Sequence, residues 1–567
     1  MRRAATAVGL VLAAILALAG CVGIPTAGGV QTGPVIASQV NSEFVVLPSG
    51  PRAGASQSEI LADFMQAVRG PQNDYAIARL FLTFSLATTW KPDASTLIRT
   101  DNAITGPSAD PNTLTYSVTS RAYVDADGRY FEQSAARQTL GFSFIQEKGE
   151  WRISKAADGI VLSQSSFNVV FAQQPLLFFD PSYTYLVPDV RWFPARATLA
   201  VRVVRALLAG PSSWLQGAVF TAFPTATTLG KDVGVQSGTA TVDLSKEAIA
   251  AGSQQRDRMR QQLEATLGPT LNVANVVMTV GGLVLAVPDS TGGGAVVNPQ
   301  VENALLIGTA TAFGFSADSS ATDNPITPIG GLSDKVLAAG AVAATLSHDK
   351  QSVAMLKADG IVSVARVSGE KSEVLDSRGG LAAPAIDPFN FVWSAVAGSA
   401  ATLTTYGTDG TEHPVQSGLP TDTSIVSMSL SRDGTRILLY LSTSVGPRLA
   451  IAGVIRGDQF VPSRLGELQT LPTSVDPAVD AAWVDDRTVA AVSQAAGVAS
   501  VTVFSLGGPS SAFGQLDTAV KISGGNGGNT ATDGLRILGA GGKIWRSGGA
   551  GRWVDTGITA TVLGTKQ

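Results

Sequence analysis

The stretch SRDGTRILLY (Ser431–Tyr440) joins a tight-turn sequence to an apolar run, and related copies recur along the second half of the chain. Asp and Gly favour a turn between strands, and the apolar run that follows is typical of a buried strand. The other copies begin at Ser347-His348-Asp349-Lys350, Ile386-Asp387-Pro388-Phe389, Val484-Asp485-Asp486-Arg487 and, in degenerate form, Gly541-Gly542-Lys543-Ile544-Trp545. Spacings of roughly 38 to 56 residues fit the four-stranded blades of a propeller. Residues 304–567 are therefore predicted to form an all-β propeller of five or six blades, closed by strands from both ends of the region.

The same turns supply four regularly spaced acids that could carry chemistry: Asp349, Asp387, Asp433 and Asp485. A pair of carboxylates cleaves a glycosidic bond when both groups flank that bond. The periodic placement instead distributes these acids around a ring, which disfavours a single catalytic pair. An envelope hydrolase that uses propeller carboxylates stays open as an alternative.

Other catalytic and cofactor signatures are weak. The two histidines, His348 and His413, fall in predicted blade turns, and the chain has one cysteine, so neither a zinc site nor a His-based triad is expected. The stretch Gly539–Lys543 superficially resembles a phosphate-binding loop, but it lacks the spacing and the Ser or Thr after Lys. We therefore predict no catalytic, cofactor-binding or metal-binding residue, and a chain that is not an enzyme.

The tetrapeptide Leu18-Ala19-Gly20-Cys21 contains the one cysteine of the 567 residues. Two arginines, an apolar run and small residues precede Cys21, which is the order of a secretory signal. The run is shorter than the ~20 residues that a spanning helix needs. The tetrapeptide matches the bacterial lipobox, in which the thiol receives a diacylglycerol and the new amine is acylated after cleavage. We predict a signal peptide over residues 1–20, lipid attachment at Cys21, and localisation at the extracytoplasmic face of the cell membrane.

The composition favours several folded domains rich in strands. Hydrophobic residues make up 45% and charged residues 15%, and 61 Gly and 28 Pro favour turns over long charged helices. A net charge of −4 without a long basic tract disfavours nucleic acid as a partner. Residues 21–47 are rich in Gly, Pro, Thr and Ser and lack periodicity, which predicts a flexible tether.

Residues 48–170 carry helix patterns first and strand patterns afterwards, the order of an α+β domain. Ser56 or Ser58 is expected to cap a helix that ends at Gly70-Pro71, and Asp74 to cap a shorter one. Strands are expected over 114–125, from Tyr130, over 140–146 and over 151–153. Helices followed by a curved antiparallel sheet resemble the cone of nuclear transport factor 2-like domains. A fold alone does not assign a function.

Residues 176–290 carry a second α+β pattern. A strand at 183–187 precedes a helix closed by Gly210-Pro211, and a strand at 239–244 precedes a helix expected to end at Gly268-Pro269. A hairpin over 273–287 follows. The fragments RALLAGPS (205–212), FPTATTLG (223–230), TATVDLS (239–245) and VMTVGG (277–282) resemble the GerMN domain of spore-germination and lipoprotein families. This resemblance implies an α+β fold and brings no known catalytic residue.

Arginines make this second segment locally basic. They are Arg191, Arg196, Arg202, Arg205, Arg256, Arg258 and Arg260. One interpretation is a solvated helix face. The other is a docking surface for an acidic partner or for anionic lipid headgroups, with Arg202, Arg205, Arg256, Arg258 and Arg260 as the candidate partner surface.

The order of these features resembles the actinobacterial LpqB lipoprotein family over essentially the whole chain. The resemblance rests on the lipobox, the tether sequence IPTAGGVQTG (Ile24–Gly33), the segment AIARLFLTFSLATTWKPD (Ala76–Asp93), and the GerMN-like domain and propeller that follow. It implies a non-enzymatic accessory beside the sensor kinase MtrB of the MtrA–MtrB two-component system, with a role in cell-wall homeostasis and cell division. Cys21 alone carries over with a defined chemical role.

Two functional hypotheses follow from these patterns. The first is the lipid-anchored accessory, whose partners are the extracellular domain of an MtrB-like kinase and the lipid bilayer. The alternative is a cell-wall glycan-binding protein or the envelope hydrolase described above. Binding of the kinase domain favours the first, whereas two acids roughly 5–9 Å apart in a cleft favour hydrolysis.

Overall fold

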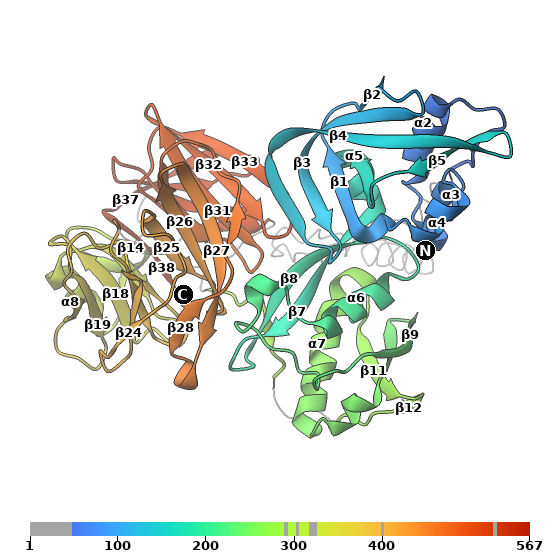
Figure 1. The fold of residues 1–567 in the computed structure, drawn as a ribbon. Coiled ribbons are helices and arrows are strands. Elements are labelled where there is room, and N and C mark those ends of the chain that lie inside the picture. The colour runs from blue at the N-terminus through green and yellow to red at the C-terminus, as the bar shows by residue number, and fades with distance from the viewer. Residues whose placement is uncertain are drawn as a thin grey trace, which may run out of the picture. The chain divides into compact units, whose positions relative to one another are not determined.

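The computed structural model describes residues 48–288, 293–301, 305–316, 326–398, 402–525 and 530–566. These residues belong to one compact unit, which contains two α+β domains and a series of four-stranded sheets (Figure 1). The predicted signal peptide, lipobox and tether lie outside the described residues. None of the helices within these ranges combines the length and the hydropathy that bilayer crossing requires.

The first domain packs short helices against a six-stranded mixed sheet. Its helices are α2 (Gln57–Ala67), α3 (Gln72–Arg79), α4 (Phe84–Thr89), η1 (Pro92–Ala94) and α5 (Gln164–Val170). Its strands are β1 (Ser95–Arg99), β2 (Ile104–Pro107), β3 (Thr113–Asp125), β4 (Tyr130–Glu147), β5 (Glu150–Lys155) and β6 (Ile160–Ser163). The strand order is β5-β4-β3-β1-β6, β2 pairs with β3, and β1 and β6 run parallel. The likeness to nuclear transport factor 2-like domains stays a prediction.

Of the two predicted caps of α2, Ser56 and Ser58, the structure shows Ser56. The Ser56 hydroxyl accepts the Glu59 amide, and the Glu59 carboxylate accepts the Ser56 amide at 2.8 Å, which together form a capping box. The prediction that Asp74 caps the next helix is wrong. Asp74 lies in a left-handed turn (φ 56°) inside α3, where its carboxylate pairs with Arg79 at 2.7 Å.

The two strands expected from Tyr130 and over 140–146 are one strand, β4, which pairs with β3 along nearly its whole length. Residues 134–137 in its middle are exposed. The β3–β4 ladder shifts register across residues 133–135, and Ala136 and Arg137 pair with Ser120 and Thr119 of β3, so pairing on both sides of the shift keeps the segment in the strand. Local sequence could not reveal this support, because β3 supplies it.

The second domain contains two small sheets and two long helices. Its elements are β7 (Phe171–Phe179), β8 (Tyr185–Pro194), α6 (Leu199–Ala209), η2 (Ser213–Leu215), β9 (Leu229–Gln236), β10 (Thr239–Leu244), η3 (Lys246–Ala250), α7 (Ser253–Leu271), β11 (Asn275–Val280), β12 (Leu283–Val284) and β13 (Val296–Val297). One sheet has the order β13-β8-β7, and the other has the order β12-β11-β10-β9 with β10 and β11 parallel. Helix α7 packs against β7. The Gln262 side-chain amide donates to the Leu177 carbonyl, and the Leu177 amide donates to the Thr266 hydroxyl.

Helix α7 does not end at Gly268-Pro269, contrary to the sequence prediction. It continues to Leu271 and ends at Asn272 in the left-handed conformation (φ 53°). Pro269 removes a backbone donor. Leu267 is fully buried and Leu271 packs against the same core, so packing holds the last turn in place.

The third region forms six blades within its described residues, of which blade 4 has five strands and the others have four. Blade 1 contains β14 (Leu305–Gly308), β15 (Phe313–Ser316), β16 (Thr327–Pro328) and β38 (Val562–Lys566), and helix α8 (Ser333–Ala339) follows β16. Blade 2 contains β17 (Ala341–Leu346), β18 (Ser352–Lys357), β19 (Val362–Arg366) and β20 (Glu373–Asp376). Blade 3 contains β21 (Ala385–Ile386), β22 (Val392–Ser394), β23 (Thr404–Tyr406) and β24 (Glu412–Pro414).

The other three blades follow in chain order. Blade 4 contains β25 (Ser424–Leu430), β26 (Arg436–Thr443), β27 (Gly446–Arg456) and β28 (Pro462–Leu465), with β29 (Gln469–Leu471) also paired to β27. Blade 5 contains β30 (Ala478–Trp483), β31 (Thr488–Ala495), β32 (Val498–Ser505) and β33 (Ser510–Leu516). Blade 6 contains β34 (Lys521–Ser523), β35 (Arg536–Leu538), β36 (Lys543–Ser547) and β37 (Trp553–Thr559).

Strands from the two ends of this region close the ring, as the repeat pattern predicts. Strand β38 pairs antiparallel with β14 and parallel with β17, so it links blades 1 and 2. The first strands of successive blades contact one another from β17 through β21, β25, β30 and β34 to β38. This continuous inner ring is the arrangement of a propeller.

Candidate functional site at the domain junction

The three domains meet around a glycine turn in blade 5 that connects β32 to β33. The indole Nε1 of Trp192 on β8 donates to the carbonyl of Gly507 at 2.6 Å. From the first domain, the Glu132 carboxylate accepts the Ser510 amide at 2.9 Å. Gly507 adopts φ +67°, and a Cβ there would lie 2.9 Å from Val190 Cβ and from its carbonyl. The turn therefore depends on glycine both for its conformation and for its close approach to β8.

A second contact joins η2 to the outer edge of blade 4. The Ser213 hydroxyl donates to the Glu467 carboxylate at 2.6 Å, and Arg129 of the first domain donates to the same hydroxyl. A Cβ at Gly453 or Gly466 would lie within 2.8 Å of the Trp214 carbonyl. The missing side chains at these two positions allow η2 to approach the blade.

A buried carboxylate fixes the segment that leads into η2. Asp189 is 2% exposed and accepts bonds from Arg191 Nη2 at 2.7 Å, the Ser212 amide at 2.8 Å and the Ser212 hydroxyl. Charge-assisted bonds of this kind are stronger than neutral ones. They hold Trp214 in a defined position beside blade 4.

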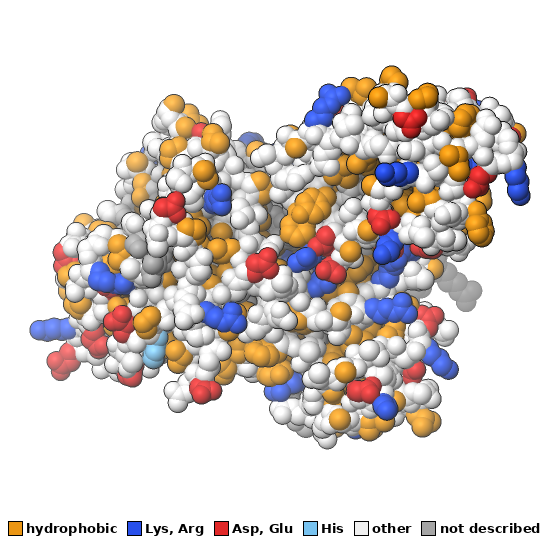
Figure 2. All heavy atoms as spheres, viewed as in Figure 1, with side chains coloured by type: hydrophobic (Ala, Val, Ile, Leu, Met, Phe, Trp, Pro, Cys, Tyr) orange, Lys and Arg blue, Asp and Glu red, His pale blue; other side chains and the backbone are white. Residues whose placement is uncertain are grey.

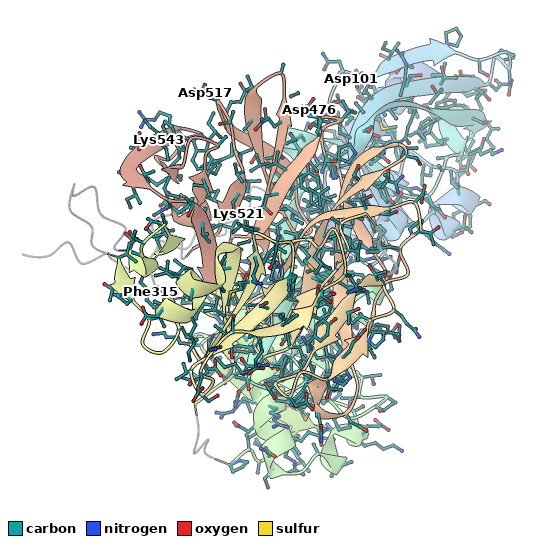
Figure 3. The ribbon with its side chains drawn as sticks, turned by 90° about the vertical axis from the view of Figure 1, so that its left-hand side faces the viewer. Asp101, Phe315, Asp476, Asp517, Lys521 and Lys543 are labelled. Carbon is teal, nitrogen blue, oxygen red and sulfur yellow. The ribbon has the colours of Figure 1, made fainter. Side chains whose placement is uncertain are left out.

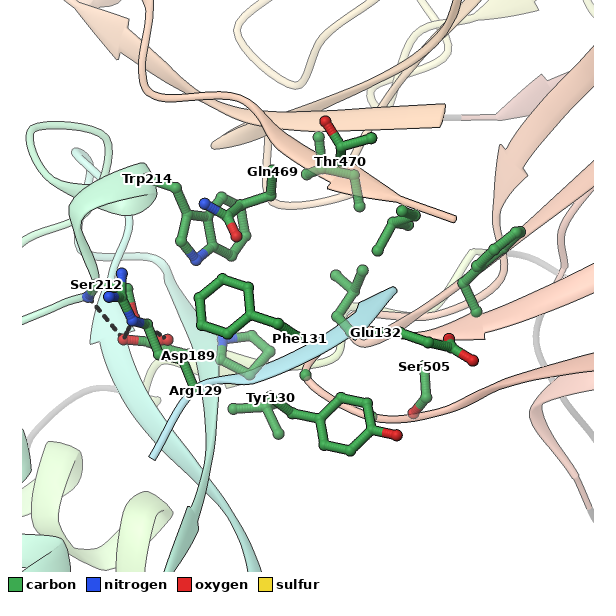
Figure 4. Close-up of a pocket in the computed structure, with 18 of the residues that line it drawn as sticks. Arg129, Tyr130, Phe131, Glu132, Asp189, Ser212, Trp214, Gln469, Thr470 and Ser505 are labelled. Atoms are coloured by element: carbon green, nitrogen blue, oxygen red, sulfur yellow. Dashed lines mark hydrogen bonds between the residues drawn. The ribbon is translucent and has the colours of Figure 1, made fainter. Parts of the chain in front are cut away.

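These contacts enclose a small pocket. It is lined by β4, β8, η2 and the outer strands of blades 4 and 5, and its volume is about 80 Å³. Figure 4 shows Phe131 and Trp214 among the side chains that line it. Burial, then the nearby Glu132 charge, raises the pKa of Tyr130 to about 12, so the phenol stays neutral. The pocket volume is well below the 300–1,000 Å³ of common ligand sites. It is a seam between domains rather than a substrate site.

The predicted arginine surface is divided between two helices. Arg202 on α6 and Arg196 just before this helix both pair with Asp93 of the first domain. Arg196 also donates to the Pro71 carbonyl at 2.8 Å. Arg205 is exposed, and it lines a cavity of about 160 Å³ with Arg202 and Asp93. Arg202 on α6 and Arg196 just before it therefore face the first domain, where both form ion pairs with Asp93.

The arginines of α7 contact their own domain. Arg256 donates to the carbonyls of Ala286 and Ile249, Arg258 lies 3.9 Å from the centroid of the Tyr183 ring, and Arg260 pairs with Asp257 at 2.6 Å. Arg191 pairs with Asp189 as described above. Figure 2 shows Lys and Arg side chains interspersed with Asp and Glu on the face in view, without a broad basic field.

The four turn acids of the propeller hold their own turns. Asp349, Asp387, Asp433 and Asp485 each follow the first strand of a blade and accept a backbone amide two residues later. Asp387 and Asp433 are buried and pair with Arg456 at 2.7 Å and Arg436 at 2.6 Å. Burial favours the neutral acid, but the Arg436 charge and bonds from Thr435 and Ser431 outweigh it and hold the pKa of Asp433 below its usual value. These acids are engaged in structural bonds.

The remaining sequence candidates also lie in blade elements. His348 lies in the β17–β18 turn, His413 lies on β24, and Gly539–Lys543 forms the turn into β36. Across the described ranges, no cluster of three or more His, Cys, Asp or Glu side chains is placed to hold a metal ion. Sequence reasoning missed the junction residues Trp192, Trp214 and Gly507. Single Trp and Gly residues carry no local signal of a contact hundreds of residues away.

In the described part of the chain, the fold and the junction define two α+β domains joined to a propeller of six blades. Three family models match it in this order: "Lipoprotein LpqB, N-terminal domain" over residues 50–168, "Sporulation and spore germination" over 175–285, and "Lipoprotein LpqB beta-propeller domain" over 318–552. The chain belongs to the LpqB lipoprotein family. None of the matched descriptions names a catalytic family.

Relatives in actinobacteria agree with this assignment. Lipoprotein LpqB of Cutibacterium acnes is 31% identical over 281 residues, which cover 49% of this chain and 47% of the relative. Lipoprotein LpqB of Thermobifida fusca is 29% identical over 303 residues, which cover 50% and 48%. The chain spans about half the length of the relatives it matches. Among solved structures, the Cps50 (Swd1) β-propeller domain of Myceliophteria thermophila aligns at 9% identity with a TM-score of 0.26, covering 38% of this chain and 70% of that one.

Proposed function

We propose that this chain is a lipid-anchored, extracytoplasmic and non-enzymatic accessory that modulates an MtrB-like sensor kinase in cell-wall homeostasis and cell division. The observation that carries the proposal is the junction, where hydrogen bonds at Gly507, Ser510 and Ser213 join three domains into one body. Such a body offers binding surfaces of fixed relative geometry. Fixed geometry is what a protein needs to distinguish two conformations of a partner.

The predicted anchor at Cys21 adds the second element of the proposal. Acyl chains confine the protein to the membrane plane, which raises its effective concentration toward a kinase in the same membrane. Signalling changes only to the extent that the accessory binds one kinase state more tightly than the other.

The hydrolase alternative receives less support from the site geometry. Asp387 and Asp433 are almost completely buried and bind arginines. A general acid or nucleophile must reach the scissile bond. Glycan binding without hydrolysis stays open, and a pull-down with purified peptidoglycan tests it directly.

The proposal is tested with the lipidated chain and the full-length kinase reconstituted together in proteoliposomes. We expect the rate of kinase autophosphorylation to change when the lipoprotein is added, and the purified kinase sensor domain to bind the lipoprotein in solution. A Cys21→Ser form is the matched control, since it keeps the folded domains and loses the predicted anchor. Absence of both binding and any rate change would contradict the proposal.

A further inference from the structure

The two ends of the propeller differ in what covers them. At one end lie the turns after each first strand, and the linker from the second domain lies against them. Arg432 donates to the Pro299 carbonyl at 3.2 Å, and the Asp486 amide donates to Asn298 Oδ1 at 3.3 Å. The other end is formed by the turns between second and third strands and by the connections between blades. We call the part of this second end that belongs to blades 4 to 6 the valine end.

The valine end exposes apolar side chains to solvent. Val475 is 89% exposed and Val445 is 75% exposed, and they lie in the connection between blades 4 and 5 and in the β26–β27 turn. Val520, in the connection between blades 5 and 6, is 53% exposed, and Val498, at the start of β32, is 43% exposed. Clustered exposed apolar side chains of this kind commonly mark an interaction site.

Hydrogen bonds connect the loops that carry these valines. The Thr473 hydroxyl donates to the Pro447 carbonyl at 3.0 Å, which joins the Val475 connection to the Val445 turn. The Gln494 amide donates to the Pro477 carbonyl at 2.9 Å, and the Ala519 amide donates to the Gln494 side chain at 3.0 Å. These bonds therefore link the loops that carry the valines across blades 4 to 6.

The charges of this surface are mainly acidic. Asp422, Asp476 and Asp517 lie in its loops, and Figure 3 shows Asp476 and Asp517 near the same end of these blades. The nearby lysines are neutralised: Lys521 pairs with Asp480 at 3.2 Å and Lys543 pairs with Asp555 at 2.8 Å. Arg448, near the start of β27, is an exposed cation on this surface. A surface of valines among acids is complementary to aliphatic side chains flanked by Lys or Arg.

We infer that the valine end binds a polypeptide segment that presents aliphatic side chains flanked by basic residues. This inference rests on the proposed function in one respect: the segment belongs to the extracellular domain of the kinase. The linker lies against the other end at blades 4 and 5, and the valine end is therefore the face that we expect a partner to reach. A few central apolar residues supply most of the affinity of such a contact, and the acids supply orientation and association rate.

The test compares two variants of the complete chain. Val445→Asp combined with Val475→Asp places charges on the valine end, and Val374→Asp is the control because Val374 is also exposed (58%) but lies on the outer strand of blade 2. Both variants change only exposed side chains, so we expect their melting temperatures to equal that of the parent. For the kinase sensor domain we expect the double variant to bind at least about tenfold more weakly, and the control to bind as the parent does.

A second probe separates the surface from the identity of the partner. A synthetic peptide of alternating Lys and Leu, with a Glu–Leu peptide as its counterpart, is titrated by fluorescence anisotropy. We expect the Lys–Leu peptide to bind the parent and the Val374→Asp control, and to lose binding in the double variant. Equal peptide binding in parent and double variant, or no binding, overturns the inference. If the peptide result holds while the kinase domain fails to bind, the surface stands and the proposed function fails.

Discussion

Replacing Asp387 with Ala should unfold the propeller at a much lower urea concentration. Asp387 is fully buried, and its two oxygens accept the Phe389 and Phe391 amides, the Trp393 indole at 3.0 Å and Arg456 Nη2 at 2.7 Å. The Arg456 side chain is 1% exposed. Removing one partner of a buried pair leaves the other charge uncompensated, which costs about 3–5 kcal/mol.

The matched control is Asp349→Ala, which removes the same turn aspartate from blade 2. Asp349 accepts the Gln351 amide at 2.9 Å and the Ser347 hydroxyl at 2.6 Å, but it is exposed and its described bonds include no arginine. Loss of such bonds at the surface costs about 1 kcal/mol. Urea unfolding followed by tryptophan fluorescence measures both free energies. Equal costs for the two variants would refute the assignment of Asp387 to a buried structural pair, and a loss of glycan cleavage with intact stability would revive the hydrolase alternative.

Three further predictions concern the junction, the propeller and the anchor. Gly507→Ala should increase hydrogen exchange at residues 129–132, because the new Cβ would lie 2.9 Å from Val190 and disturb the junction. Gly497→Ala is the control, since Gly497 has a similar positive φ and open space around it. Equal exchange in the two variants would rule out a role of Gly507 in docking. The Arg436 charge and the hydrogen bonds that Thr435 and Ser431 donate to Asp433 hold the pKa of Asp433 below its usual value, although burial favours the neutral acid. The ionised form therefore stabilises the fold above the unfolded pKa, and this contribution is lost as the pH falls below about 4. Thermal melts from pH 7 to pH 3 should show that loss, and an Asp433→Asn variant with an equally steep acid limb would contradict it. Cys21→Ser should move the protein from the membrane fraction to the soluble fraction and abolish palmitate labelling; continued labelling would exclude Cys21 as the acylated residue.

Periodic, local patterns predicted much of the architecture. The Asp-Gly turn at 433–434 and its copies indicated the blades, and the expected cap at Ser56 or Ser58 indicated the start of α2, which the structure places after Ser56. Each of these signals depends on atoms within a few residues of one another. The local sequence therefore predicts these turns and this helix cap directly.

The errors arose where distant residues decide the local structure. Strand β4 remains continuous through an exposed segment because β3 pairs with it, and α7 passes Pro269 because its last turn packs on the core. The junction contacts of Trp192 and Gly507 join positions 315 residues apart. No local pattern encodes a pairing of that kind, and a basic composition at α6 gave no indication that Arg202 would bind Asp93.

Strand β38 lies at the C-terminal end of the propeller region but completes its first blade, so the ring cannot close until this last strand has been made. Until residues 562–566 are synthesised, β14 has an unpaired edge beside an open gap in the ring. Unpaired edges promote association with other chains, and closure across so long a loop is entropically slow. A chain stalled before this strand would thus be prone to aggregation and proteolysis, whereas the finished ring conceals that edge.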